Sequence, residues 1–165
     1  MADDHEFHAE IRDVGAQQTV CARITAPSDE LQDVFRRLPV AVFERIRATG
    51  AEPAGPLFAR YHAFGTEQVD VEIGFPVTEP LSDLSPVPEI DAGEIGSSML
   101  PAGRVAYTIH RGPYDGLSDS YDRLHEWIHA AGLSEGSGPW ESYVDDPGDM
   151  SDMANVRTEI IWPIG

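Results

Sequence analysis

The chain contains two copies of one pattern, and this repeat constrains the fold more than any other feature. Each copy opens with alternating apolar residues, passes through a short turn into a helix-like stretch, and closes on a strand. The closing segments, 70–77 and 157–164, share in step a glutamate, an isoleucine, an aromatic residue and a proline. Self-similarity of this kind predicts two copies of one supersecondary unit.

The elements before these closing strands agree as well. Alternating apolar residues over 18–24 and 104–110 predict one strand in each copy. The helix-like stretches end at Gly50 and Gly132, where a left-handed C-terminal cap is needed. The second helix has an apolar stripe that must face a sheet, formed by Leu117, Tyr121, Leu124, Ile128 and Ala131. In the first copy Pro39 would kink a helix interior, so we expect the main helix to begin there.

These patterns predict a single α+β domain over 1–165, made of duplicated β-α-β-β units in pseudo-twofold relation, with antiparallel sheets around a central groove. The first copy covers about 5–78, a connector rich in Pro, Ser, Asp and Glu about 79–88, and the second copy about 89–165. Segment 89–99 mirrors 7–14. We therefore expect each of these segments to be the first strand of its own copy.

Composition excludes several classes of function. No apolar run is long enough to span a bilayer, and the acidic N-terminus lacks the features of a secretory signal, so we expect a cytoplasmic location without a membrane partner. The 29 acidic and 11 basic residues give a net charge of −18. Such a surface repels phosphate backbones, so we expect no direct nucleic-acid partner. The single cysteine, Cys21, lies in an alternating run and is expected to be a small core residue.

Three stretches occur in an order that is more specific than any one of them: 99–117, 140–147 and 158–164. They contain Gly112-Pro113-Tyr114-Asp115, Trp140-Glu141-Ser142-Tyr143 and Glu159-Ile160-Ile161-Trp162, respectively. This series resembles the GyrI-like small-molecule-binding family, also known as the effector-binding domain of AraC- and MerR-type regulators. The resemblance covers nearly the whole chain. Because it leaves no room for a helix-turn-helix, we expect a stand-alone member.

The resemblance implies a duplicated fold whose cleft binds hydrophobic, often cationic, aromatic compounds over a buried glutamate and stacking aromatic residues. Family members act as drug-sensing modules, as free proteins that sequester toxins or inhibit gyrase, and in some cases as hydrolases of cyclopropane-bearing DNA alkylators. No cofactor is implied.

Glu141 is the first candidate for the cleft carboxylate. It lies two residues before Tyr143 in a predicted strand, so both side chains leave the same face. The position two before Tyr61 in the first copy is Ala59, so this glutamate occurs in one copy only. A residue that only maintains the scaffold would be expected to occur in both copies, so its occurrence in one copy favours a functional role for Glu141. Against aromatic rings a buried Glu141 would attract a cation or have its pKa raised.

The remaining candidates are aromatic walls and a second acid. Tyr107, Tyr114 and Trp162 are expected to stack on a flat ligand, although each is also consistent with simple core packing. Glu159 recurs as Glu72 in the first copy, so it is expected to be structural and remains a secondary candidate for ligand binding.

The segment His125-Glu126-Trp127-Ile128-His129 fits the H-E-x-x-H pattern of zinc hydrolases. The pattern is short, the apolar stripe assigns this helix to packing, and the histidines fall on its solvent flank. No third ligand follows at a familiar spacing. We therefore disfavour a zinc protease and expect no metal site.

Three hypotheses follow. The leading one is a non-catalytic protein that binds a hydrophobic, cationic or aromatic small molecule through Glu141 and its aromatic neighbours. The second is a hydrolase of cyclopropane-bearing or related electrophilic compounds, with Glu141 activating water and Tyr107 or Tyr143 orienting the leaving oxygen. The third is a protein that inhibits a partner such as gyrase, or binds a regulator, through its acidic surface.

Overall fold

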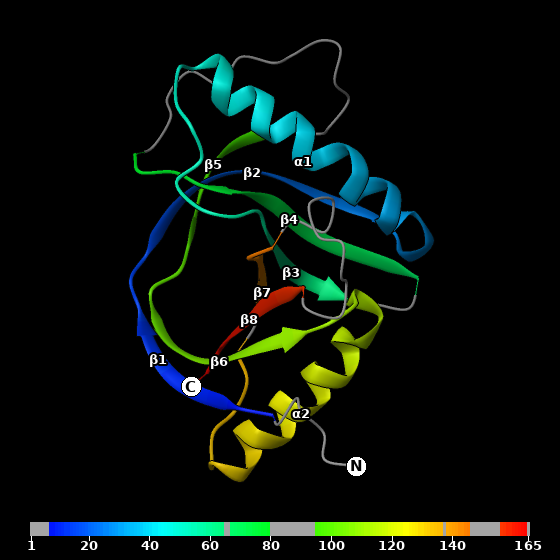
Figure 1. Cartoon of the computed structure of the whole chain (residues 1–165), viewed down its shortest axis with the longest axis vertical. Helices are drawn as coiled ribbons and strands as arrows, with labels where there is room; N and C mark the ends of the chain where they lie inside the picture. The colour runs from blue at the N-terminus through cyan, green and yellow to red at the C-terminus, as the bar shows by residue number, and fades with distance from the viewer. Residues whose placement is uncertain (1–6, 65–66, 80–94, 137, 146–155, 165) are drawn as a thin grey trace. The chain divides into compact units, whose positions relative to one another are not determined.

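The computed structural model describes residues 7–64, 67–79, 95–136, 138–145 and 156–164 (Figure 1). They fall into two compact units. The central unit contains the described part of Gly15–Ala102, and the terminal unit joins the described parts of Met1–Val14 and Gly103–Gly165. No helix among the described residues has both the length and the apolar character needed to cross a membrane.

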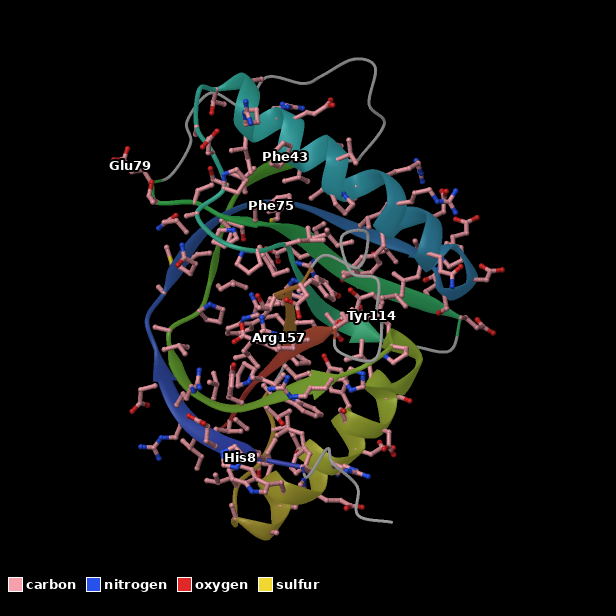
Figure 2. All side chains as sticks on the ribbon, in the orientation of Figure 1. His8, Phe43, Phe75, Glu79, Tyr114 and Arg157 are labelled. Atoms are coloured by element: carbon pink, nitrogen blue, oxygen red, sulfur yellow. The ribbon has the colours of Figure 1, made fainter. Side chains whose placement is uncertain are left out.

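The central unit is an antiparallel sheet with one helix on it. Its strands are β2 (Gln17–Pro27), β3 (Phe58–Phe64), β4 (Gln68–Pro76) and β5 (Ile95–Leu100), paired in the order β5-β2-β4-β3. A short 3-10 turn, η1 (Ser28–Glu30), leads into α1 (Leu31–Ala48), which packs against β2 and β4. The buried face of α1 carries Val34, Leu38, Ala41, Val42 and Ile46. Phe43 of α1 meets Phe75 of β4 edge to face, with ring centroids 5.8 Å apart (Figure 2).

The expectation that the main helix begins at Pro39 is wrong, because α1 already begins at Leu31 and Pro39 lies inside it. Proline has no N–H to donate to the carbonyl four residues before it, which costs helix stability. The apolar stripe on α1 continues on both sides, with Leu38 just before the proline and Val42 after it, both buried. Burial of this stripe against the sheet outweighs the local preference.

The terminal unit has the same plan. Its strands are β1 (Ala9–Val14), β6 (Gly103–Arg111), β7 (Trp140–Tyr143) and β8 (Arg157–Pro163), paired antiparallel in the order β1-β6-β8-β7. A 3-10 turn, η2 (Tyr114–Gly116), precedes α2 (Leu117–Ala130). The predicted stripe on α2 is confirmed up to Ile128: Leu124 and Ile128 are buried with Ala106 and Ile160, and Leu117 and Tyr121 pack around them, whereas Ala131 is exposed.

The pairing of the two edge strands, β1 and β5, differs from the expectation. The sequence predicts that each is the first strand of its own copy. Strand β1 pairs with β6, and β5 pairs with β2, so each edge strand joins the sheet formed by the other copy. Periodicity identifies a strand but does not choose its partner, which is why the exchange could not be read from the pattern. The expected connector, about 79–88, lies outside the described residues except for Glu79.

The predicted helix caps are confirmed. Gly50 and Gly132 have φ angles of 87° and 77°, the left-handed conformation that glycine adopts without a steric penalty.

Candidate functional site

Glu141 lies beneath helix α2. In the β7–β8 register it is opposite Ile160, and Ile160 packs with Leu124 and Ile128 of α2. Directly opposed residues in neighbouring strands share a face of the sheet, so Glu141 points toward the helix. Its exposure is 3%. Glu141 belongs to the stretch 140–147, whose last two residues, Asp146 and Pro147, lie outside the described residues.

Two phenol groups hold the Glu141 carboxylate. Tyr121 Oη donates to Oε2 at 2.9 Å, and Tyr143 Oη donates to Oε1 at 2.7 Å. Within the described part of the chain no arginine or histidine forms an ion pair with Glu141. Burial raises the pKa of Glu141, and the two tyrosine hydrogen bonds oppose that rise because they stabilise the charged form. Among the described residues, the site is therefore a buried acid without a protein counter-charge.

Two further aromatic rings pack on the tyrosines that contact this acid. Tyr114 meets Tyr143 edge to face with centroids 5.9 Å apart, and Tyr121 meets Trp162 in the same way at 5.6 Å. We call Glu141, Tyr114, Tyr121, Tyr143 and Trp162 the Glu141 cluster. Three of the aromatic candidates from the sequence, Tyr114, Tyr143 and Trp162, thus come together with Glu141.

Tyr121 was not among the sequence-derived site residues. Tyr121 lies in the apolar stripe of α2, and its ring packs against the core around Leu124, as that stripe predicts. The signal that could have identified it is chemical, because a buried tyrosine needs a partner for its hydroxyl group. That partner is Glu141.

Tyr107 and Glu159 lie on the opposite face of the sheet from Glu141, so the expected grouping of Tyr107 with Glu141 needs correction. Tyr107 is opposite Ile161, the neighbour of Ile160 in β8, and successive residues in a strand point to opposite faces. Tyr107 donates a hydrogen bond to Glu159, and the Arg12 guanidinium carbon lies 3.6 Å from the centre of its ring. Burial, followed by the Glu159 contact, raises the pKa of Tyr107 to about 12.

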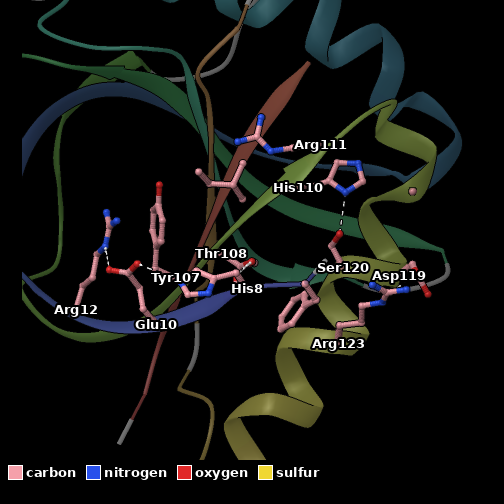
Figure 3. A pocket seen from close by; sticks show the side chains of 13 residues that line it. His8, Glu10, Arg12, Tyr107, Thr108, His110, Arg111, Asp119, Ser120 and Arg123 are labelled. Carbon is pink, nitrogen blue, oxygen red and sulfur yellow. Dashed lines mark hydrogen bonds and ion pairs between the residues drawn. The ribbon is translucent and has the colours of Figure 1, made fainter. Parts of the chain in front are cut away.

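A groove of about 520 Å³ lies near Tyr107 (Figure 3). The β1–β6 pairing ends where Ala9 meets Thr108, and the groove follows the part of β6 beyond that point. Arg12 and Tyr107 lie at one side, and His110 and Ser120, which are 2.7 Å apart through Nδ1 and Oγ, lie at the other. Glu141 does not line this groove. The groove is therefore a different feature from the Glu141 cluster.

The central unit has a buried glutamate in a different environment. Glu72, the repeat counterpart of Glu159, accepts a hydrogen bond from Cys21 Sγ at 3.0 Å and contacts His62 Nε2 at 2.8 Å. Cys21 is buried, as predicted, and burial raises the pKa of its thiol. Glu72 thus has a thiol and an imidazole as partners, whereas the partners of Glu141 in the described part of the chain are two tyrosine hydroxyl groups.

The fold is that of a small-molecule-binding domain. The family model of the GyrI-like small molecule binding domain matches residues 41–165. The chain belongs to this family. No curated protein sequence matches the chain at a significant level.

Solved structures share the fold at low sequence identity. The EcmrR C-terminal domain superposes with a TM-score of 0.79 and 22% identity, covering 96% of this chain and 98% of that domain. EcmrR in its DNA-bound transcription complex gives a TM-score of 0.81 and 24% identity over 97% of this chain. The chain spans 58% of the length of that EcmrR chain.

Two further structures are more distant. A hydrolase encoded by lin2189 of Listeria innocua gives a TM-score of 0.66 and 13% identity, covering 95% of this chain and 91% of that chain. SAV2435 bound to tetraphenylphosphonium gives a TM-score of 0.59 and 11% identity, covering 96% and 94%, respectively.

Proposed function

We propose that this protein binds hydrophobic organic cations, with the Glu141 carboxylate as the counter-charge and the surrounding aromatic rings as the walls. The observation that carries the proposal is the burial of Glu141 at 3% exposure with two tyrosine hydroxyls as its partners. A buried carboxylate without a paired cation is costly. A ligand that brings a positive charge removes that cost.

The aromatic walls favour the same class of ligand. Tyrosine and tryptophan rings attract cations through their faces and cover apolar groups at the same time. A delocalised cation surrounded by aryl groups matches both properties, because it loses little hydration on entering an apolar site. Tetraphenylphosphonium, the compound bound to SAV2435, has this chemistry.

Ligand entry requires a side chain to move. At 3% exposure Glu141 cannot be reached directly, and the hydroxyls of Tyr121 and Tyr143 occupy both of its oxygens. We infer that a ligand displaces at least one of these rings and takes over its contact with the carboxylate. The affinity then reflects the exchange of a hydrogen bond from an uncharged phenol for an ion pair with the ligand.

The test is a thermal-shift screen of the wild type, Glu141→Gln and the control Glu159→Gln, which changes an acid on the opposite face of the same sheet. The probes are tetraphenylphosphonium, cationic dyes and the neutral compound triphenylphosphine oxide. We expect cations to stabilise the wild type and the control but not Glu141→Gln. Equal stabilisation of all three proteins would contradict the proposal.

Hydrolysis is the second candidate. An acid whose pKa is raised by burial is suited to exchange protons near neutral pH, and a structural neighbour is described as a hydrolase. Tyr143 contacts Glu141, whereas Tyr107 is on the other sheet face, so the tyrosine in this alternative is Tyr143. Mass spectrometry of each stabilising compound after incubation decides: a changed compound favours hydrolysis, and recovery of intact compound favours binding alone.

We further propose that the two units arose by duplication. The two sheets have the same arrangement, β5-β2-β4-β3 and β1-β6-β8-β7, and in each the helix follows the strand next to the edge strand, β2 or β6. This shared arrangement supports the origin by duplication. The pseudo-twofold arrangement, the cytoplasmic location and the absence of a nucleic-acid partner remain predictions.

A further inference from the structure

Helix α2 carries two histidines one turn apart, and a carboxylate lies against both. His129 Nε2 is 2.9 Å from each carboxylate oxygen of Glu135, and His125 Nδ1 contacts Oε1 of the same group. One ligand atom from each of the three residues lies within 4.8 Å of the other two. The H-E-x-x-H segment lacked a third ligand in the sequence, and the fold supplies one six residues after His129.

The backbone fixes Glu135 in this place. After α2, the amides of Gly132 and Leu133 donate to carbonyls in the last turn of the helix at 3.0 and 3.1 Å, which reverses the chain direction. Leu133 then packs on the core of the terminal unit. Glu135 itself forms an antiparallel bridge with Ile164. The carboxylate is therefore presented by anchored backbone rather than by a free loop.

Both imidazole rings converge on one carboxylate. The two ring centroids are 4.4 Å apart, and each ring has a nitrogen atom in contact with Glu135. Imidazole nitrogen is the commonest protein ligand for metal ions. A divalent cation satisfies both rings and the carboxylate at once.

We propose that His125, His129 and Glu135 form a binding site for a divalent first-row transition metal, with zinc as the representative ion. Two histidines and one glutamate are an established zinc ligand set, with water in the remaining position. Ligand atoms about 2.0–2.1 Å from a tetrahedral ion are roughly 3.4 Å apart. The 2.9 Å contacts between His129 and Glu135 would therefore open by about 0.5 Å, and the shorter contact between His125 and Glu135 would open further. The histidine side chains are 54% and 55% exposed, which leaves the ion accessible to water.

This site and the Glu141 cluster have no residue in common. His125 lies one helical turn beyond Tyr121, and its ring centroid is 6.4 Å from that of Trp162, a member of the cluster. The three ligands form no hydrogen bond or ion pair with Glu141. Glu126, the acid within the H-E-x-x-H segment, is exposed and is not part of the group. We therefore assign metal binding and no hydrolytic step.

The test uses the full chain after removal of metal by chelation. Co²⁺ is titrated while visible absorption is recorded, and Zn²⁺ binding is measured by calorimetry, for the wild type, His129→Gln, Glu135→Gln and the matched control Glu126→Gln. Circular dichroism establishes that each variant is folded. Glu141→Gln is included to keep this result separate from that of the organic-cation site.

We expect one ion per wild-type chain with the absorption bands of low-coordinate cobalt. We expect Glu135→Gln and His129→Gln to weaken Zn²⁺ binding at least tenfold, and Glu126→Gln and Glu141→Gln to stay within about twofold of the wild type. Absence of binding by the wild type at 100 µM Zn²⁺ overturns the proposal. Binding that survives both ligand substitutions reflects scattered surface acids and overturns it as well.

Discussion

At the scale of single residues, the environment of Glu141 distinguishes it from the other buried glutamate. Burial acts to raise the pKa of Glu72, but the hydrogen bond from Cys21 and the contact with His62 outweigh burial, so that its pKa is lowered. Glu141 contacts two phenols, and its pKa is raised by burial. The two buried glutamates therefore differ in their polar partners, which are a thiol and an imidazole for Glu72 and two phenols for Glu141.

This difference predicts how pH changes stability. Since folding raises the pKa of Glu141, the folded state keeps the proton over a range in which the unfolded chain has lost it. The free energy of unfolding therefore falls as pH rises from the pKa of the unfolded chain, about 4.3, to the pKa of the folded protein. Each unit by which folding raises the pKa of Glu141 lowers the free energy of unfolding at high pH by about 1.4 kcal/mol. Glu141→Gln removes this loss. We expect the variant to gain stability relative to the wild type at pH 8 but not at pH 4, as measured by urea unfolding. A pH-independent difference would contradict the assignment.

A second residue-scale prediction concerns Tyr143. Its hydroxyl donates to the Glu141 carboxylate at 2.7 Å, and hydrogen bonds to charged groups contribute about 1.5–3 kcal/mol. Tyr143→Phe is expected to destabilise the ligand-free protein by about this amount at pH 8 in denaturant titrations. The loss should shrink in the Glu141→Gln background. An equal loss in both backgrounds would mean that the hydroxyl acts through another partner.

At the scale of elements, most of the fold could be predicted and the pairing could not. The repeat identified the strands before each helix, the closing strands and the glycine caps, because these follow local periodicity and backbone preference. The start of α1 at Leu31 and the exchange of β1 and β5 depend on tertiary burial and partner choice. For the same reason the sequence brought Glu141 and Tyr143 together but misplaced Tyr107, whose face depends on register.

Gly74 gives a test of the β2–β4 packing. A Cβ atom at this position would lie 2.1 Å from the carbonyl oxygen of Val20 and 2.6 Å from Cys21 Cα, both backbone atoms. Gly74→Ala must therefore push the strands apart and is expected to lower the free energy of unfolding by at least about 1–3 kcal/mol. Gly96→Ala in β5, where a Cβ meets nothing within 4 Å, is the matched control. Similar unfolding midpoints for the two variants would refute this packing.

At the scale of the whole molecule, the net charge of −18 attracts cations from a distance. Salt screens this field, with a Debye length of about 8 Å at 0.15 M. We expect the association rate of a fluorescent cationic dye in stopped flow to fall several-fold between about 20 mM and 0.5 M NaCl, while its dissociation rate changes little. A neutral dye serves as the control. An association rate that is insensitive to salt would mean that the acidic surface plays no part in capture.

The most direct measurement of the central claim is calorimetric titration of tetraphenylphosphonium and neutral triphenylphosphine oxide into the wild type, Glu141→Gln and Glu159→Gln at pH 8. We predict that the wild type binds the cation at least tenfold more tightly than the neutral compound, and that Glu141→Gln abolishes this preference while Glu159→Gln retains it. A preference for the cation that persists without the Glu141 carboxylate would contradict the account.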